Sequence, residues 1–168
     1  EGYTIAGLEK VVDWQCPISN GRMVNLSGRA DRIDRRADGS LQIIDYKSGN
    51  TPHLEYNGME ALFRGGAQER VSNIFQTMLY SMILHRKYKL ESCPSLYFAS
   101  KMLNDDYSPL ILDRTTGAYV ERFSDISEEF ESELNATLEE LFDYSTPFRQ
   151  TEDEDMCKYC DFKKICRR

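Results

Sequence analysis

Two β-rich segments separated by a tight turn constrain the fold of this chain more than any other feature. Residues 41–44 form an apolar run of strand-forming residues, and residues 23–34 are expected to form the strand before it. Between them lies Ala37-Asp38-Gly39-Ser40, a sequence typical of a hairpin turn. We therefore predict two strands joined by a hairpin, with charged side chains near the strand ends.

These charged side chains form a pattern with chemical meaning. Asp45 and Lys47 are two residues apart, so in a strand they point to the same face and Tyr46 points to the other. Asp31 lies near the end of the preceding strand. Hard carboxylate oxygens hold divalent cations, and a nearby ammonium can act on the attacking water or on charge that develops at phosphorus. The pattern is typical of metal-dependent phosphodiester hydrolysis.

Composition limits the class of protein. The chain has 168 residues, enough for one domain, and its 40% hydrophobic and 29% charged residues are typical of a soluble globular protein. No apolar run approaches the roughly 20 residues needed to cross a bilayer, so we expect a cytoplasmic protein without a membrane partner. The net charge of −7 argues against binding to nucleic acid through overall charge. The chain begins at Glu1 without a methionine, as expected for a fragment of a larger polypeptide or for a chain with a cleaved tag.

The remaining segments complete an α/β pattern. Further strands are expected over 3–14, 95–100 and 110–112, and helices over 71–86 and about 127–144. Residues 48–69 contain a proline and several glycines with few periodic apolar positions, which predicts a loop. Ser127 is a candidate N-cap of the last helix. This order implies a sandwich in which helices flank a mixed sheet.

Three motifs in a fixed order carry a family resemblance. They are Gly28-x-x-Asp31-Arg32-x-Asp34, then Ile43-Ile44-Asp45-Tyr46-Lys47-Ser48-Gly49, then Gln76-x-x-x-Tyr80. From about residue 23 to its end, the chain resembles the RecB-type branch of the PD-(D/E)XK nucleases, which includes the nuclease domains of RecB and AddB and CRISPR-associated exonucleases. The resemblance implies a restriction-endonuclease-like mixed β-sheet flanked by α-helices. It places the nuclease core over 1–147 and a cysteine-bearing staple over 148–168.

The resemblance also implies a role for each matched residue. Asp31 and Asp45 would bind Mg²⁺ or Mn²⁺, with the main-chain carbonyl of Tyr46 as a further ligand. Lys47 would orient or help to deprotonate water and neutralise charge in the transition state.

Four other polar residues can be interpreted in two ways. Gln76 and Tyr80 share a helix face, so they can reach the site or the DNA backbone, although spacing alone would make them an ordinary polar helix edge. Asp34 and Glu9 could approach the metal. We instead expect Asp34 to pair with an arginine of the hairpin and Glu9 to face solvent.

One feature departs from the family. RecB-type members usually carry a metal-binding histidine on a helix before the first strand. This chain has only His53 and His85, which both follow the Asp-x-Lys motif. We expect either that this helix belongs to a preceding part of a larger protein or that metal binding is impaired.

The C-terminal region carries three cysteines, Cys157, Cys160 and Cys166, spaced Cys-x2-Cys-x5-Cys. Cys-x2-Cys alone is compatible with a zinc knuckle or a redox pair. Three clustered thiols with one distant partner suit a 4Fe-4S cluster, and the arrangement resembles the iron–sulfur staple of AddB-type nucleases, with zinc as the main alternative. Cys16 and Cys93 are possible fourth ligands, but isolated cysteines are more often buried apolar residues.

The resemblance implies a DNA exonuclease domain of a helicase–nuclease that works in recombination and double-strand-break repair. Its partners would be DNA and a helicase domain or a subunit of a repair complex. The alternative from another class is a catalytically silent DNA-binding or scaffold domain on the same fold. RNA cleavage is a third possibility, because the same chemistry permits it.

Overall fold

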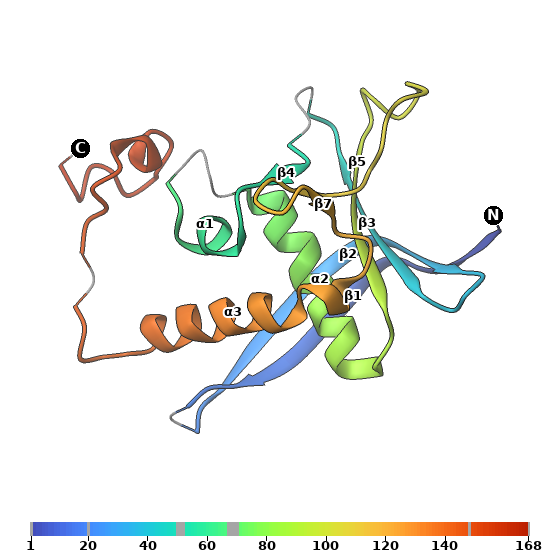
Figure 1. The fold of residues 1–168 in the computed structure, drawn as a ribbon. Helices are drawn as coiled ribbons and strands as arrows, with labels where there is room; N and C mark the ends of the chain where they lie inside the picture. The colour runs from blue at the N-terminus through green and yellow to red at the C-terminus, as the bar shows by residue number, and fades with distance from the viewer. Residues whose placement is uncertain (1, 20, 50–52, 67–70, 148, 168) are drawn as a thin grey trace.

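A four-stranded sheet forms the centre of the fold (Figure 1). The computed structural model describes residues 2–19, 21–49, 53–66, 71–147 and 149–167. The strand order is β1-β2-β3-β5, with bounds β1 (Tyr3–Pro17), β2 (Met23–Arg36), β3 (Leu41–Lys47) and β5 (Ser92–Phe98). β1 pairs antiparallel with β2, β2 antiparallel with β3, and β3 parallel with β5. The predicted hairpin and the mixed sheet are confirmed.

A second, smaller sheet and three α-helices complete the described structure. The small sheet has the order β4-β6-β7, with bounds β4 (Glu55–Tyr56), β6 (Leu112–Asp113) and β7 (Ala118–Tyr119). The helices are α1 (Met59–Arg64), α2 (Ser72–Tyr88) and α3 (Ser127–Leu141), with short 3₁₀ turns η1 (Phe123–Asp125) and η2 (Glu154–Cys157). In the described ranges, no helix is long and apolar enough to span a membrane.

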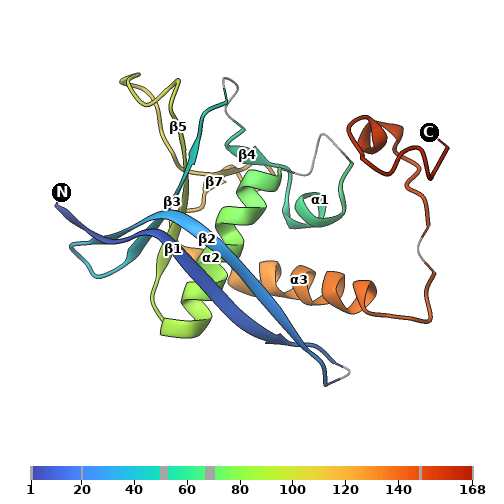
Figure 2. The same ribbon diagram turned by 180° about the vertical axis from the view of Figure 1, so that it is seen from behind.

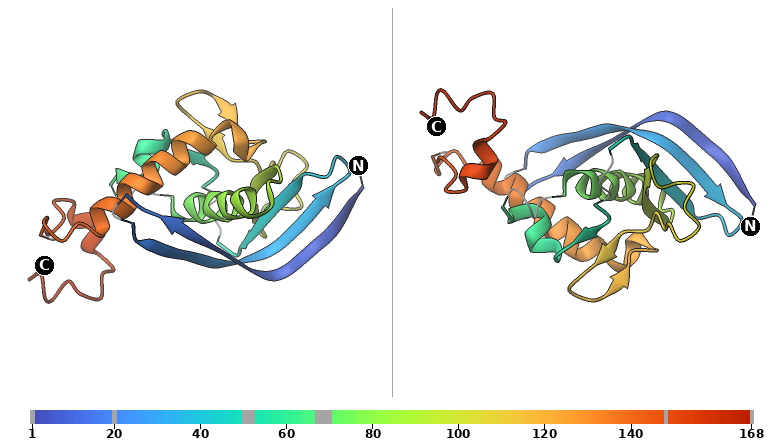
Figure 3. Two further views of the ribbon diagram at one scale, coloured as in Figure 1. Left: turned by 90° about the horizontal axis from the view of Figure 1, so that it is seen from below. Right: turned by 90° about the horizontal axis from the view of Figure 1, so that it is seen from above.

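Helix α2 connects the parallel strands β3 and β5 and packs on the main sheet. Figure 2 shows the β1–β2 hairpin passing in front of this helix. Seen from below and from above, α2 lies on the concave side of the curved main sheet (Figure 3). Helix α3 lies on the side of α2 that faces away from this sheet. The core lies between these layers, where Ile43, Ile83 and Phe130 are fully buried. A helix that crosses over between parallel strands places its first turns near the carboxyl end of the first strand.

The predicted loop over 48–69 is wrong in part, because β4 and α1 lie within it. The buried residues of α1 are Met59, Leu62 and Phe63. A helix of six residues is too short for its apolar periodicity to be distinguished from a loop. Tertiary packing stabilises it, since the Phe63 ring contacts the Phe130 ring of α3 with centroids 5.2 Å apart. Residues 50–52 and 67–69 of the predicted loop lie outside the described residues.

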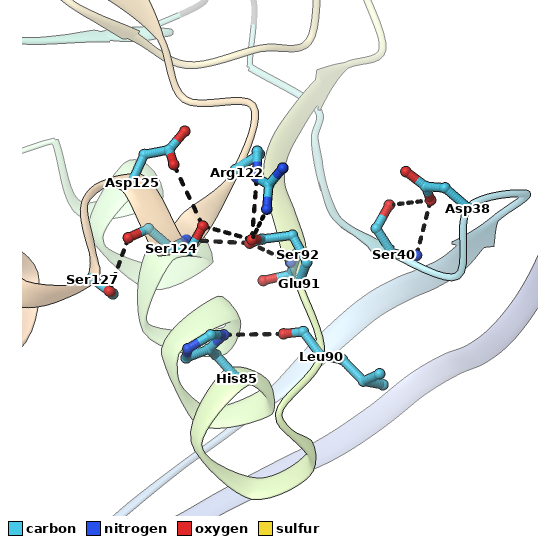
Figure 4. A network of polar contacts seen from close by, with 10 residues as sticks. All are labelled: Asp38, Ser40, His85, Leu90, Glu91, Ser92, Arg122, Ser124, Asp125 and Ser127. Atoms are coloured by element: carbon cyan, nitrogen blue, oxygen red, sulfur yellow. Dashed lines mark hydrogen bonds and ion pairs between the residues drawn. The ribbon is translucent and has the colours of Figure 1, made fainter.

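The start of α3 also differs from the prediction. The helix begins at Ser127, but Ile126 occupies the N-cap position and no side chain caps the helix. The Ser127 hydroxyl instead donates a hydrogen bond to the carbonyl of Ser124 at 3.0 Å (Figure 4). The turn η1 runs directly into α3, so this serine lies inside the helical region rather than before it. Ser127 as the N-cap is therefore wrong.

The partly buried carboxylate of Glu91 joins the start of β5 to the turn η1 (Figure 4). Glu91 accepts hydrogen bonds from the Ser124 hydroxyl at 2.6 Å, from the Ser92 N–H at 3.0 Å and from Arg122 at 3.1 Å. Burial alone would raise the pKa of Glu91, but the hydrogen bonds from Ser124, Ser92 and Arg122 outweigh burial, so its pKa is lowered. The ionised form of this side chain therefore stabilises the junction.

We expect Glu91→Gln to lower the free energy of unfolding by about 2 kcal/mol near neutral pH. Because the folded pKa of Glu91 is lowered, its contribution is present above the unfolded pKa and is lost as the pH falls through the folded value. The difference between wild type and variant should therefore shrink below about pH 4. Urea denaturation at several pH values measures it, with exposed Glu121→Gln as the control. An equal loss at every pH would contradict a role for the charge.

Candidate active site

The strands β2 and β3 separate at the point where the candidate carboxylates lie. Their pairing runs from Arg35↔Leu41 to Arg32↔Ile44, and beyond it β3 continues on β5 alone. Asp31 and Asp45 are the first residues beyond the last pair, one on each strand. The Asp31 Oδ2 atom accepts a hydrogen bond from the Tyr46 N–H at 2.8 Å. The Asp31 carboxylate therefore reaches across the opening between the two strands.

The β1–β2 hairpin is irregular around Asp31. Ala30 and Ile33 are 0% and 5% exposed although they are three residues apart, so β2 does not alternate regularly between them. On β1, Glu9 lies between the partners of Arg32 and Ala30 and has a φ of 48°. Such irregularities turn a side chain away from the face that alternation would give it. Asp31 lies in this irregular stretch, between the two buried positions.

Asp45 and Lys47 lie on the face of β3 that packs toward α2. The Asp45 side chain is buried, and its Oδ2 atom lies 2.6 Å from the Lys47 Nζ atom. This oxygen receives no well-aligned hydrogen bond from the described residues. Burial raises the pKa of Asp45, Lys47 lowers it, and the charge of Asp31 raises it, with a net increase. Two carboxylates thus share one opening with one ammonium.

The main-chain carbonyl of Tyr46 faces the same opening. In an extended strand, the N–H and C=O of one residue point to one edge and those of the next residue point to the other. The Lys47 carbonyl accepts a hydrogen bond from the Ala99 N–H at 2.9 Å, on the β5 side. The Tyr46 N–H bonds to Asp31 on the β2 side. The Tyr46 carbonyl therefore points toward Asp31.

Helix α2 contributes two polar side chains to this site. Gln76 Oε1 lies 3.4 Å from the Lys47 Nζ atom, which donates to it, and Gln76 Nε2 donates to the Tyr80 hydroxyl at 2.8 Å. Both residues come from the part of α2 that lies near the end of β3. The structure therefore brings the Gln-x-x-x-Tyr pair to Lys47.

Two acidic residues of the hairpin lie elsewhere. Arg32 donates two hydrogen bonds of 2.8 Å to Asp34, and both side chains lie on the sheet face opposite Asp45. The expected pairing of Asp34 with an arginine is confirmed. Glu9 is exposed and lies 3.8 Å from Arg29, so its expected solvent-facing position is also confirmed.

The sequence matches the family described as the PD-(D/E)XK nuclease superfamily over residues 1–167, almost the whole chain. This chain belongs to the PD-(D/E)XK nuclease superfamily. The mixed sheet with flanking helices is consistent with its restriction-endonuclease-like fold. Superfamily members generally hydrolyse phosphodiester bonds, so the domain is of the nuclease type. A search of curated proteins finds no match.

PD-(D/E)XK nucleases usually use divalent metals such as Mg²⁺, and the donor set here fits such an ion. Asp31, Asp45 and the Tyr46 carbonyl supply hard oxygen atoms at one opening, and one oxygen of Asp45 is buried without an aligned hydrogen bond. In the described ranges, no group of three His, Cys, Asp or Glu side chains gathers as a metal site. Main-chain oxygen and water would therefore complete the coordination of Mg²⁺ or Mn²⁺.

The histidines and cysteines have other surroundings. His53 is exposed, and the ring of His85 bonds through Nδ1 to the Leu90 carbonyl at 3.1 Å, at the end of α2 (Figure 4). Cys16 and Cys93 are buried free thiols, as expected for isolated cysteines.

The three clustered cysteines lie in the C-terminal segment, which Figure 1 shows beyond α3 and away from the main sheet. All three are partly exposed free thiols. The iron–sulfur assignment stays a prediction.

Sequence reasoning missed the role of Gly28. This residue was part of a motif, but its contact with Tyr80 was not foreseen. The available signal was a glycine in a strand interior, which often marks the close approach of another group.

Proposed function

We propose that this domain is a Mg²⁺- or Mn²⁺-dependent DNA exonuclease domain that acts in recombination and double-strand-break repair as part of a helicase–nuclease. The observation that carries the proposal is the meeting of Asp31, Asp45 and Lys47 where β2 and β3 separate. Membership of the PD-(D/E)XK superfamily supports phosphodiester chemistry. The RecB-like order of the three motifs supports the exonuclease and repair assignments.

The side chains have complementary tasks in this proposal. Asp31, Asp45 and the Tyr46 carbonyl hold the divalent cation, which would activate a water molecule and offset charge on the scissile phosphate. The Lys47 ammonium has three N–H donors. One of them meets Gln76 Oε1, and the ammonium also forms an ion pair with Asp45, so a donor is left that can meet a phosphate oxygen or the attacking water. Such fixed donors stabilise charge in the transition state without reorganisation.

A cleavage assay tests the proposal. Linear and closed-circular DNA, single- and double-stranded, and RNA would be incubated with the protein and Mg²⁺, Mn²⁺ or EDTA. The proposal predicts metal-dependent shortening of linear DNA from its ends, with closed circles and RNA left intact. Binding without cleavage, also in the full-length protein, would overturn it in favour of a silent scaffold. Cleavage of RNA alone would overturn the DNA assignment.

The C-terminal cysteines give a separate prediction. If Cys157, Cys160 and Cys166 hold a 4Fe-4S cluster in the intact protein, Cys160→Ser should remove the visible iron–sulfur absorbance. Cys16→Ser and Cys93→Ser then test whether either buried thiol is the fourth ligand, because only the loss of a ligand should remove the absorbance. Metal analysis that finds stoichiometric zinc and no iron would contradict the cluster.

A further inference from the structure

Gly28 is the point on β2 against which the Tyr80 ring packs. A Cβ atom added to Gly28 would lie 2.7 Å from the Tyr80 hydroxyl oxygen and 2.8 Å from Cζ, and closer still to Cε1. Tyr80 is 5% exposed and comes from α2, so its ring is enclosed between the helix and the sheet. Any side chain at position 28 must therefore displace this ring, because close-packed interiors do not absorb such overlap.

The hydroxyl of Tyr80 anchors the Gln76 amide beside Lys47. Gln76 Nε2 donates to this hydroxyl at 2.8 Å, and Gln76 Oε1 faces the Lys47 Nζ atom at 3.4 Å. An ammonium only donates, so it must be met by Oε1; an amide turned by half a rotation would present N–H groups to it. The Tyr80 hydroxyl can accept or donate, so the ammonium selects the orientation of the amide. By accepting from Nε2, the hydroxyl holds the amide in place in that orientation.

Lys47 is thus held from two sides, by Asp45 Oδ2 at 2.6 Å and by Gln76 Oε1 at 3.4 Å. We propose that Gly28 is a positioning residue for Lys47. Its missing side chain lets Tyr80 pack on β2, where Tyr80 anchors Gln76 and Gln76 holds the ammonium.

The inference rests on the proposed function, in which Lys47 acts on the water and the phosphate charge. It gives the first residue of the Gly-x-x-Asp motif a role separate from metal binding. Metal binding falls to Asp31, whose carboxylate lies on the opening between β2 and β3. The two roles can therefore be separated by experiment.

Kinetics of three variants test the proposal. We expect Gly28→Ala to lower kcat on the order of 10²-fold, because a displacement of about 1 Å at a reacting group can have this effect. KM and the Mn²⁺ affinity from calorimetry should stay within about twofold, since the carboxylates are untouched. In the Gln76→Ala background, Gly28→Ala should slow cleavage by no more than about twofold further, because both changes act through one contact.

Gly7→Ala is the matched control on β1, the neighbouring strand. The added Cβ would meet only the side chain of Lys10, at 3.3 Å, so kcat should not change. If Gly28→Ala fails to fold, Tyr80→Phe carries the test, because it keeps the ring on Gly28 and removes only the hydroxyl that anchors Gln76. It should show the same loss of kcat with unchanged Mn²⁺ affinity.

A second readout does not depend on cleavage. The side-chain amide protons of Gln76, assigned by their loss in Gln76→Ala, should exchange with water about tenfold faster in Gly28→Ala and Tyr80→Phe than in wild type. If the wild type does not cleave DNA but exchange follows this pattern, the positioning contact stands and the proposed function fails. A folded Gly28→Ala variant with wild-type kcat and exchange would overturn the inference. The inference would also be overturned if the losses of kcat caused by Gly28→Ala and Gln76→Ala multiply in the double variant.

Discussion

Replacing Asp45 with asparagine should abolish divalent-metal binding and, with it, DNA cleavage. Asparagine has the size of aspartate, so the packing at this buried position is kept while the charge is lost. We expect Mn²⁺ affinity to fall by at least about 10²-fold. The cleavage rate should fall by at least about 10³-fold, since a catalytic metal contributes several kcal/mol to the transition state. Calorimetric titration and single-turnover cleavage measure the two effects.

Asp34→Asn is the matched control for this change. Asp34 and Asp45 are both 3% exposed, on adjacent strands, but Asp34 pairs with Arg32 on the opposite face of the sheet. The control should lower stability by about 1–3 kcal/mol and leave Mn²⁺ affinity unchanged. An Asp45→Asn variant that titrates like the wild type would remove Asp45 from the ligand set.

Replacing Lys47 with methionine should separate metal binding from cleavage. Methionine keeps the length of the side chain but has no N–H donor. Because Lys47 Nζ lies 2.6 Å from Asp45 Oδ2, its removal frees this oxygen, so Mn²⁺ affinity near neutral pH should stay the same or rise. Cleavage should fall by about 10²- to 10⁴-fold, the range for loss of a positioned proton-transfer or charge-stabilising group.

The control is Lys10→Met, a change of the same type at an exposed position of β1. It should leave both quantities unchanged. If Lys47→Met cleaves DNA at the wild-type rate, Lys47 has no part in the chemistry. If it loses metal binding as well, its role is structural.

The strands that carry the site could be predicted from sequence because their signals are local. The turn at Asp38-Gly39 and the apolar run 41–44 identify the hairpin, and alternation places Asp45 and Lys47 on one face. The spacing of Gln76 and Tyr80 likewise follows from helix geometry. These features depend on residues a few positions apart.

Other features depend on packing between distant segments and could not be predicted. The helix α1 is stabilised by contact of Phe63 with α3, and strand β7 has only two residues. The irregular stretch of the hairpin around Ala30, Ile33 and Glu9 is likewise not indicated by any local pattern. The contact between Gly28 and Tyr80 joins residues 52 positions apart, so the glycine alone indicated a close approach without naming its partner.

A crystal structure with Mn²⁺, read from the anomalous scattering of the ion, tests the account most directly. We predict a peak within coordination distance of one oxygen from Asp31, one from Asp45 and the Tyr46 carbonyl, with the Lys47 ammonium beside it. A protein whose Asp31 and Asp45 carboxylates point away from each other, with manganese bound only elsewhere, would contradict it.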